Sequence, residues 1–364
     1  MSTFFEDLAC SHIRDLVPYQ SARRIGGHGH NFLNANEAFK SELYMFNSTT
    51  LHRYPDCQPL ETVTGYADYA GVAHDRVLVS RGSDEAIGLL IRLLCEPHRD
   101  GIVIAPPTYG MYAIAARTNM AKVAVARRRD DLRLEAAAVL EAIDGADFTV
   151  KAVFIDSPGN PLGVAFDQEE LIRILEARPE VLVVMDEAYI EFCPELSCLP
   201  LQKRFRNLVV TRTLSKAFAL AGIRCGFVLA DPELIRLLLK IIDPYPIPDP
   251  VAQISRQAVA EGGIGLMRER VSDICTRREA LRAELEKLSC VVRVHPSQAN
   301  FLLTEFRNGP EVFNYVAQRG IILRSFEHEE ALRNCVRITV GSADELNELG
   351  KALTAYDGAA AGPA

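Results

Sequence analysis

The sequence predicts an α/β fold, and three observations support this prediction. Between residues 77 and 230, short apolar runs rich in Val, Ile and Leu alternate with longer stretches whose apolar positions recur at helical spacing. The short runs are apolar throughout, which is typical of strands covered on both faces. After residue 250 the order of elements changes. We therefore expect a large domain with a roughly seven-stranded, mostly parallel sheet covered by helices, followed by a small α+β domain.

The large domain is predicted from its apolar runs. The expected strands of its sheet are 77–80, 101–105, 122–126, 151–155, 181–185, 207–210 and 226–230. The stretch 83–95 follows the first of them and predicts a helix. Residues 244–250 hold four prolines in seven positions, so this segment can form neither a regular helix nor a central strand. It marks the end of the large domain.

The pattern beyond the prolines predicts the small domain. A long, charged and amphipathic helix is expected at roughly 264–287. Shorter elements follow, with strands expected near 290–294, 299–304, 320–324 and 335–340, and helices near 310–319 and 342–355. Residues from 357 on read as a frayed end. We divide the chain into an N-terminal segment (1–50), a large domain (51–250) and a small C-terminal domain that includes the interdomain helix (251–364).

The composition excludes several classes of protein. The 364 residues carry 40 Lys and Arg against 48 Asp and Glu, a formal net charge of −8, which argues against nucleic-acid binding. The nine cysteines are an odd number and are spread thinly from Cys10 to Cys335, so we expect free thiols in a reducing compartment. The first twenty residues lack the apolar core of a signal peptide, and no apolar stretch is long enough to span a bilayer. We expect a cytoplasmic protein without membrane or nucleic-acid partners.

The segment 211–227 contains a lysine in an unusual setting. Lys216 lies among small and apolar residues, after the hydroxyls of Thr213 and Ser215 and before Arg224. Such surroundings desolvate a lysine and lower its pKa, which makes the neutral amine available for a Schiff base. The hydroxyls and the guanidinium suit a phosphate-bearing cofactor. The alternative interpretation is an ordinary surface lysine at the start of a helix.

The segment 181–192 places a carboxylate at a strand end. Asp186 follows an apolar run, where a buried charge needs a cationic partner. Ligands of open α/β sheets bind at the carboxyl ends of strands, so Asp186 and nearby Tyr189 are candidate ligand contacts. Acidic residues at strand ends also occur in metal-dependent enzymes. We expect no metal here, since His28 and His30 have no further ligands at usable spacing.

Two turns complete the set of candidate segments. In 80–90, Ser83 and Asp84 open a helix after a strand, where free backbone N–H groups form an anion site; Ser83 could also be a simple helix cap. In 156–163, Asn160 could point its amide at a ligand or belong to an ordinary turn. Neither turn has the glycine pattern of an ATP or dinucleotide site.

Together these four segments resemble the fold-type I pyridoxal-phosphate-dependent aminotransferases of class II, and more narrowly the histidinol-phosphate aminotransferases. The resemblance runs over nearly the whole chain. It also includes PYQSARR (18–24), LNANE (33–37), RYPDCQPLE (53–61), APPTYGMY (105–112), GIILR (320–324) and VRITVG (336–341). It implies a fold-type I transferase whose large domain binds pyridoxal 5′-phosphate. Residues 1–50 would then form a substrate lid, make dimer contacts and pack with the small domain.

The resemblance implies a role for each residue at the cofactor ring. Lys216 would form the Schiff base with the cofactor and later move the proton between the substrate and the cofactor. Asp186 would pair with the pyridinium nitrogen, so that the ring acts as an electron sink. Tyr189 and Asn160 would hydrogen-bond the phenolic oxygen, and Tyr109 would stack on the ring.

The resemblance also implies two anion sites and a shared active site. The cofactor phosphate would lie among Ser83, Asp84, Thr213, Ser215 and Arg224. Tyr54 would reach the cofactor phosphate of a neighbouring subunit, which implies a homodimer with active sites shared across the interface. Arg337 matches the carboxylate-binding arginine of the family, and with Arg324 and Tyr19 it would bind the substrate.

The implied reaction transfers an amino group between L-histidinol phosphate and 2-oxoglutarate, giving imidazole-acetol phosphate and L-glutamate in two ping-pong half-reactions of histidine biosynthesis. Three alternatives stay open: an aromatic-amino-acid aminotransferase, a paralogue similar to threonine-phosphate decarboxylase, and a non-catalytic regulatory protein that binds the cofactor. Two departures from the usual family motif, Gly159 and Leu162, fall where we expect the turn geometry or the substrate entrance to respond.

Overall fold

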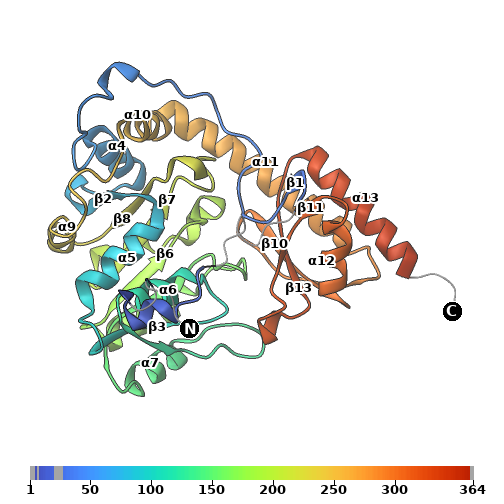
Figure 1. Cartoon of the computed structure of the whole chain (residues 1–364), viewed down its shortest axis with the longest axis horizontal. Helices are drawn as coiled ribbons and strands as arrows, with labels where there is room; N and C mark the ends of the chain where they lie inside the picture. The colour runs from blue at the N-terminus through green and yellow to red at the C-terminus, as the bar shows by residue number, and fades with distance from the viewer. Residues whose placement is uncertain (1–4, 6–7, 20–27, 361–364) are drawn as a thin grey trace.

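The computed structural model describes residues 5, 8–19 and 28–360. Residues 20–24 of the PYQSARR motif lie outside the described residues. Within the described part, the chain forms a large domain around one sheet and a smaller domain, and helix α11 (Glu261–Leu285) runs from one to the other (Figure 1). No helix among the described residues is long and apolar enough to cross a membrane. All nine cysteines are free thiols.

The sheet of the large domain has seven strands, as the sequence predicts. Their order is β2-β8-β7-β6-β5-β3-β4. Only β8 runs antiparallel to its neighbours, and the other pairs are parallel. The strands are β2 (Val77–Ser80), β3 (Asp100–Ile104), β4 (Lys122–Val125), β5 (Thr149–Asp156), β6 (Leu182–Asp186), β7 (Leu208–Thr213) and β8 (Gly226–Leu229).

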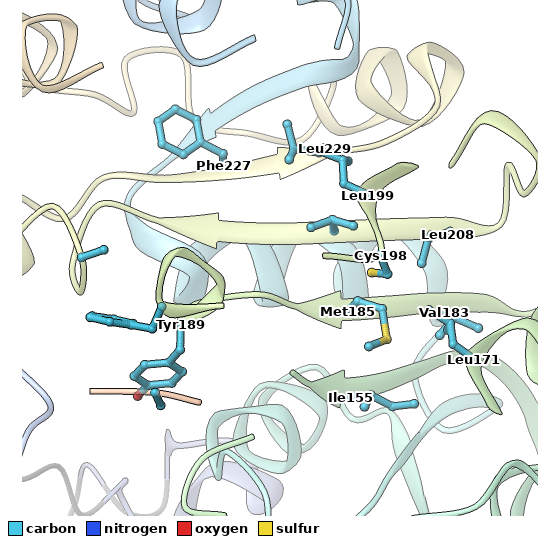
Figure 2. Close-up of a cluster of buried hydrophobic side chains, with 14 of the residues drawn as sticks. Ile155, Leu171, Val183, Met185, Tyr189, Cys198, Leu199, Leu208, Phe227 and Leu229 are labelled. Atoms are coloured by element: carbon cyan, nitrogen blue, oxygen red, sulfur yellow. The ribbon is translucent and has the colours of Figure 1, made fainter. Parts of the chain in front are cut away.

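Helices cover both faces of this sheet, which explains the continuous apolar runs. Along β6, Val183 and Met185 enter one hydrophobic cluster, while Val184 between them enters another. Figure 2 shows part of the first cluster, where side chains of β5, β6, β7 and β8 gather on one face of the sheet. The helices of this domain are α4 (Leu60–Ala70), α5 (Gly82–Leu94), α6 (Met111–Thr118), α7 (Ala136–Asp144), α8 (Gln168–Ala177), α9 (Pro232–Leu238) and α10 (Asp249–Ala258).

Two local features of the large domain refine the sequence analysis. Helix α5 begins at Gly82, so Ser83 lies inside its first turn, and the structure gives no side-chain capping bond there. The interpretation of Ser83 as a helix cap is therefore wrong. The proline-rich segment ends where α10 begins, with Pro250 in the first turn, a position that needs no backbone N–H donor.

The small domain is built on an antiparallel sheet of four strands in the order β12-β13-β10-β9. Its elements are β9 (Val291–Val294), β10 (Phe301–Phe306), α12 (Gly309–Ala317), β11 (Ile321–Ile322), β12 (Arg324–Ser325), β13 (Cys335–Thr339) and α13 (Ala343–Ala360). Helix α13 is longer than expected: Asp357, placed in a frayed end by the sequence analysis, is helical. Its carboxylate accepts hydrogen bonds from the backbone N–H groups of Ser289 and Cys290, which holds the last turns in place.

The N-terminal segment packs on the small domain. Strand β1 (Asn31–Phe32) pairs in parallel with β11, with Asn31 opposite Ile321 (Figure 1). The Asn31 side chain also donates to the Glu345 carbonyl in α13 at 3.0 Å. The residues that follow β1 therefore run along the boundary between the two domains.

Candidate active site

A cavity of about 800 Å³ lies where the two domains and the N-terminal segment meet. Its floor is formed by residues at or just after the carboxyl ends of β5, β6 and β7, as expected for an open α/β sheet. Every candidate residue from the sequence analysis except Tyr54 lines it. These are Tyr19, Ser83, Asp84, Tyr109, Asn160, Asp186, Tyr189, Thr213, Ser215, Lys216, Arg224, Arg324 and Arg337.

Lys216 follows strand β7 and lies inside the cavity. Its Nζ donates a hydrogen bond to the backbone carbonyl of Ala35 at 2.9 Å. Burial, helped by the positive charge of Arg337, lowers the pKa of Lys216 to about 8. A substantial fraction of this amine is therefore neutral near physiological pH, the form that can act as a nucleophile.

Asp186 is the last residue of β6 and is almost fully buried. One carboxylate oxygen accepts a hydrogen bond from the Tyr112 hydroxyl at 2.9 Å. The other, Oδ1, has no hydrogen-bond partner among the described residues. Burial raises the pKa of Asp186 to about 7, although the Tyr112 hydroxyl opposes the rise. A buried acceptor without a partner is costly, so this oxygen suits a ligand that brings an N–H donor.

Tyr189 reaches the same cavity through a residue that the sequence analysis did not single out. The side-chain amide of Asn36 donates to the Tyr189 hydroxyl at 2.9 Å. Asn36 has a positive φ of 53° and is tied to the small domain by Thr339, whose hydroxyl accepts from its backbone N–H at 3.0 Å. Burial raises the pKa of Tyr189 to about 12. Tyr189 therefore stays a neutral hydrogen-bonding group.

The expected phosphate site lies at the start of α5. Arg224 donates to the Ser215 hydroxyl at 3.3 Å and to the Asp84 carboxylate at 3.1 Å. The Thr213 hydroxyl bonds that of Ser215 at 2.9 Å, and the Tyr109 hydroxyl donates to Asp84 at 2.8 Å. Hydroxyls, a guanidinium and helix N–H groups thus converge at one end of the cavity, where a phosphate would compete with Asp84 for Arg224.

Two arginines lie side by side at the other end of the cavity. Arg324 on β12 is directly opposite Arg337 on β13. Arg337 donates to the Asn34 carbonyl at 2.6 Å and to the side-chain oxygen of Asn160. Arg324 Nη1 and Arg337 Nε are buried and have no hydrogen-bond partner among the described residues. Like charges held together with free donors favour an anionic ligand.

Three predicted residues have surroundings that differ from the expectation or extend it. Asn160, expected at the cofactor ring, has its amide oxygen on Arg337. Tyr19 meets Tyr109 edge to face, with ring centroids 6.0 Å apart. Tyr54 does not line the cavity: its side chain is 80% exposed and stacks on Tyr245 at 4.3 Å.

The sequence of the chain is similar to those of known proteins. The family model for "Aminotransferase class I and II" matches residues 26–353. The histidinol-phosphate aminotransferase of Aeromonas hydrophila is 51% identical over 342 residues, which cover 94% of this chain and 95% of that protein. That of Escherichia coli O9:H4 is 46% identical over 350 residues, or 96% and 97% of the two chains.

Solved structures share the fold. The histidinol-phosphate aminotransferase of Sinorhizobium meliloti, solved in complex with pyridoxal-5′-phosphate, has a TM-score of 0.84 at 21% identity and covers 96% of this chain and 98% of that one. The L-threonine-O-3-phosphate decarboxylase of Porphyromonas gingivalis has a TM-score of 0.74 at 19% identity, covering 89% and 98%. At this level of identity the likeness concerns the fold alone.

Proposed function

The chain belongs to the class I and II aminotransferase family and is a pyridoxal-phosphate-dependent transaminase of fold type I; from this premise we propose that it transfers the amino group between L-histidinol phosphate and 2-oxoglutarate in histidine biosynthesis. The observation that carries the proposal is the pair Arg324 and Arg337, which lie opposite each other on neighbouring strands and both line the cavity. Relatives at 45–51% identity over nearly the full chain are histidinol-phosphate aminotransferases.

The arginine pair suits two substrates of different chemistry. A guanidinium offers a planar fork that binds a carboxylate or a phosphate through two hydrogen bonds. Glutamate and 2-oxoglutarate bring a side-chain carboxylate, whereas histidinol phosphate brings a phosphate. One pair of arginines can therefore hold the distal anion of either substrate in turn.

The buried polar groups of the cavity fit pyridoxal phosphate. The orphaned Oδ1 of Asp186 offers an acceptor for the ring N–H, and the hydroxyls of Thr213 and Ser215 with Arg224 offer a phosphate site. When bound, the cofactor supplies an electron sink for the carbanion formed at the substrate Cα. Lys216, with its pKa lowered to about 8, would hold and move the proton at that carbon.

The proposal extends to a homodimer. Tyr54 is 80% exposed and belongs to a segment between residues 43 and 60 that displays several apolar side chains to solvent: Leu43, Met45, Phe46, Leu51 and Leu60. An exposed apolar segment of this kind favours contact with another protein surface. A second copy seated there would cover these side chains and carry Tyr54 toward the neighbouring site. We place this enzyme in the cytoplasm, where its nine free thiols would stay reduced.

A steady-state comparison tests the proposed substrate. Histidinol phosphate and phenylalanine are each supplied with 2-oxoglutarate, and threonine phosphate is supplied alone with detection of carbon dioxide. We expect kcat/KM to be higher for histidinol phosphate than for phenylalanine, because a phosphate can bind both arginines and a phenyl ring cannot. We expect no carbon dioxide from threonine phosphate. A preference for phenylalanine would indicate an aromatic aminotransferase, and release of carbon dioxide a decarboxylase; either would overturn the proposal.

A further inference from the structure

A second carboxylate lies beside Asp186 and has no role in the function proposed above. Asp156 is the last residue of β5, and the register of the sheet places it directly opposite Asp186 on β6. Its side chain is buried, with 6% exposed. It also lines the cavity. A buried carboxylate at this position demands compensation from its neighbours.

The compensation comes from two loops at once. Asp156 Oδ1 accepts a hydrogen bond from the Thr108 hydroxyl at 2.7 Å. Oδ2 accepts from the backbone N–H of Tyr109 at 3.2 Å and from that of Asn160 at 2.8 Å. Thr108 and Tyr109 belong to the loop after β3, and Asn160 belongs to the loop after β5. One side chain therefore joins the loop that carries the ring-stacking tyrosine to the loop that carries Asn160.

A half-buried arginine, Arg128, supports the charge of this carboxylate. Arg128 donates to the backbone carbonyls of Ala105 at 3.0 Å and Leu132 at 3.2 Å. Burial raises the pKa of Asp156, whereas the positive charge of Arg128 and the hydrogen bonds from Asn160 and Thr108 lower it. If either loop moved away, the carboxylate would lose donors that burial prevents water from replacing. The two loops are thus coupled through it.

We propose that Asp156 is a positioning residue that ties the loop of Tyr109 to the loop of Asn160, so that both side chains hold fixed places in the cavity. The inference rests on the proposed function, because it gives Tyr109 and Asn160 a task at the cofactor and the substrate. Asp156 itself acts through these two residues.

A pair of substitutions separates its hydrogen bonds from its charge. In Asp156→Asn, the amide oxygen can still accept from the two backbone N–H groups, and the NH₂ can donate to the Thr108 hydroxyl. In Asp156→Ala, all three bonds are lost. We expect the Ala variant of the full-length enzyme to bind pyridoxal phosphate roughly 10-fold to 100-fold more weakly. The Asn variant should stay within about 3-fold of the parent, since its hydrogen bonds are restored.

Hydrogen exchange tests directly whether Asp156 holds the two loops in place, and its result does not depend on catalysis. In Asp156→Ala, amide exchange should rise together in the segments 107–110 and 157–162, and Asp156→Asn should reverse most of this rise. The visible circular dichroism of the bound cofactor should weaken in parallel, because its ring would be held less firmly. Should the Ala variant fail to fold, Asp156→Ser replaces it in the same comparison.

The outcomes discriminate between the inference and the function on which it rests. Exchange that rises in one segment only, or an Asn variant as impaired as the Ala variant, would overturn the positioning role. Tyr109→Ala and Asn160→Ala serve as the second test. Suppose that exchange responds as expected while these two variants bind cofactor and substrate like the parent. In that case Asp156 does hold the two loops together, but the site roles proposed for Tyr109 and Asn160 are wrong.

Discussion

The two ends of the cavity differ in how they are built. At one end, Asp186 and Lys216 lie at or just after β6 and β7, strands with neighbours on both sides and hydrophobic clusters on both faces. At the other end, Arg324 lies on a strand of two residues at the edge of the small sheet. The end at which we propose the reaction (the reacting end) thus lies among strands that are covered on both faces, and the end that we propose binds the substrate anion (the recognition end) is carried by a separate domain.

The difference extends to the charges. Burial raises the pKa of Asp186 to about 7 and lowers that of Lys216 to about 8, which brings both groups within reach of proton exchange near neutrality. Burial lowers the pKa of Arg337 as well, to about 10, yet this arginine stays charged. Burial thus shifts the pKa values of Asp186 and Lys216 toward neutrality but leaves Arg337 charged, as the proposed binding of anions requires.

The largest effect is expected from Lys216→Ala, which removes the amine from the enclosed end. Turnover should fall by roughly 10⁴-fold or more, since no other described lysine lines the cavity. The visible absorbance of the lysine-bound cofactor should disappear. The exposed Lys240→Ala serves as the matched control. Persistence of both the absorbance and the turnover would show that the chemistry does not depend on Lys216.

Asp186→Asn should move activity and stability in opposite directions. We expect kcat to fall by about 10²-fold to 10³-fold, as when an electrostatic group at a reacting centre is lost. In the cofactor-free protein, folding raises the pKa of Asp186 from 3.8 to about 7. The free energy of unfolding of the parent should therefore fall as the pH rises through this range. The Asn variant should therefore melt a few degrees higher than the parent at pH 8.

The stability difference in Asp186→Asn should shrink toward pH 5, where the parent carboxyl is largely protonated in the folded state. Thermal melts of the cofactor-free proteins between pH 5 and pH 8 measure this, with Asp130→Asn as an exposed control. A constant gap across this range would mean that Asp186 is not the group that titrates.

A smaller and more selective effect is expected at the recognition end. Arg337→Lys keeps the charge but replaces the planar fork by a single ammonium. We expect KM for both substrates to rise by roughly 10-fold to 100-fold, with kcat changed much less. The exposed Arg319→Lys provides the control. A fall in kcat with unchanged KM would place Arg337 at the reacting end and remove the contrast between the two ends.

The smallest effect is expected at a contact between the two domains, where one of the departures from the family motif lies. Leu162 is buried and packs on Leu303, Phe326 and Leu332 of the small domain. Leu162→Thr, which restores the common family residue, should lower the free energy of unfolding by about 2 kcal/mol, because it removes apolar contacts and buries a hydroxyl. Urea denaturation measures the loss, and Leu162→Met should cost less. Unchanged stability would show that this contact does not join the domains.

The strands and the residues at their ends could be predicted from the sequence alone. Apolar runs located all seven strands of the large sheet. The rule that ligands bind at the carboxyl ends of parallel strands placed Asp186 at the cavity, which it lines. Lys216 was found from its apolar setting. The strands and Lys216 could be predicted because their signals lie in neighbouring residues of the sequence. Asp186 could be predicted because ligands of open α/β sheets bind at the carboxyl ends of the strands.

The contacts that complete the site depend instead on residues distant in the chain. Asn36 supports Tyr189, and Asp156 binds Thr108 and Tyr109, yet nothing near these residues in the sequence indicates their partners. A polar residue in an otherwise apolar run, as Asp156 is at the end of β5, was the available signal. The role of Asn160 at the cofactor stays a prediction. The hydrogen bond from Arg337 to its amide oxygen could not be foreseen, because the approach of the small domain cannot be deduced from a turn motif.

The short parallel pair β1–β11 bears on how the enzyme is made. It joins Asn31 to Ile321, and the residues just after β1 present the Asn34 carbonyl to Arg337 and the Ala35 carbonyl to Lys216. During synthesis the N-terminal segment leaves the ribosome first but must wait for almost the entire chain before its partner strand exists. A ribosome-bound intermediate can complete its sheet and still lack the last wall of its pocket. We therefore expect that the active site cannot be complete before residues 321–322 have been synthesised.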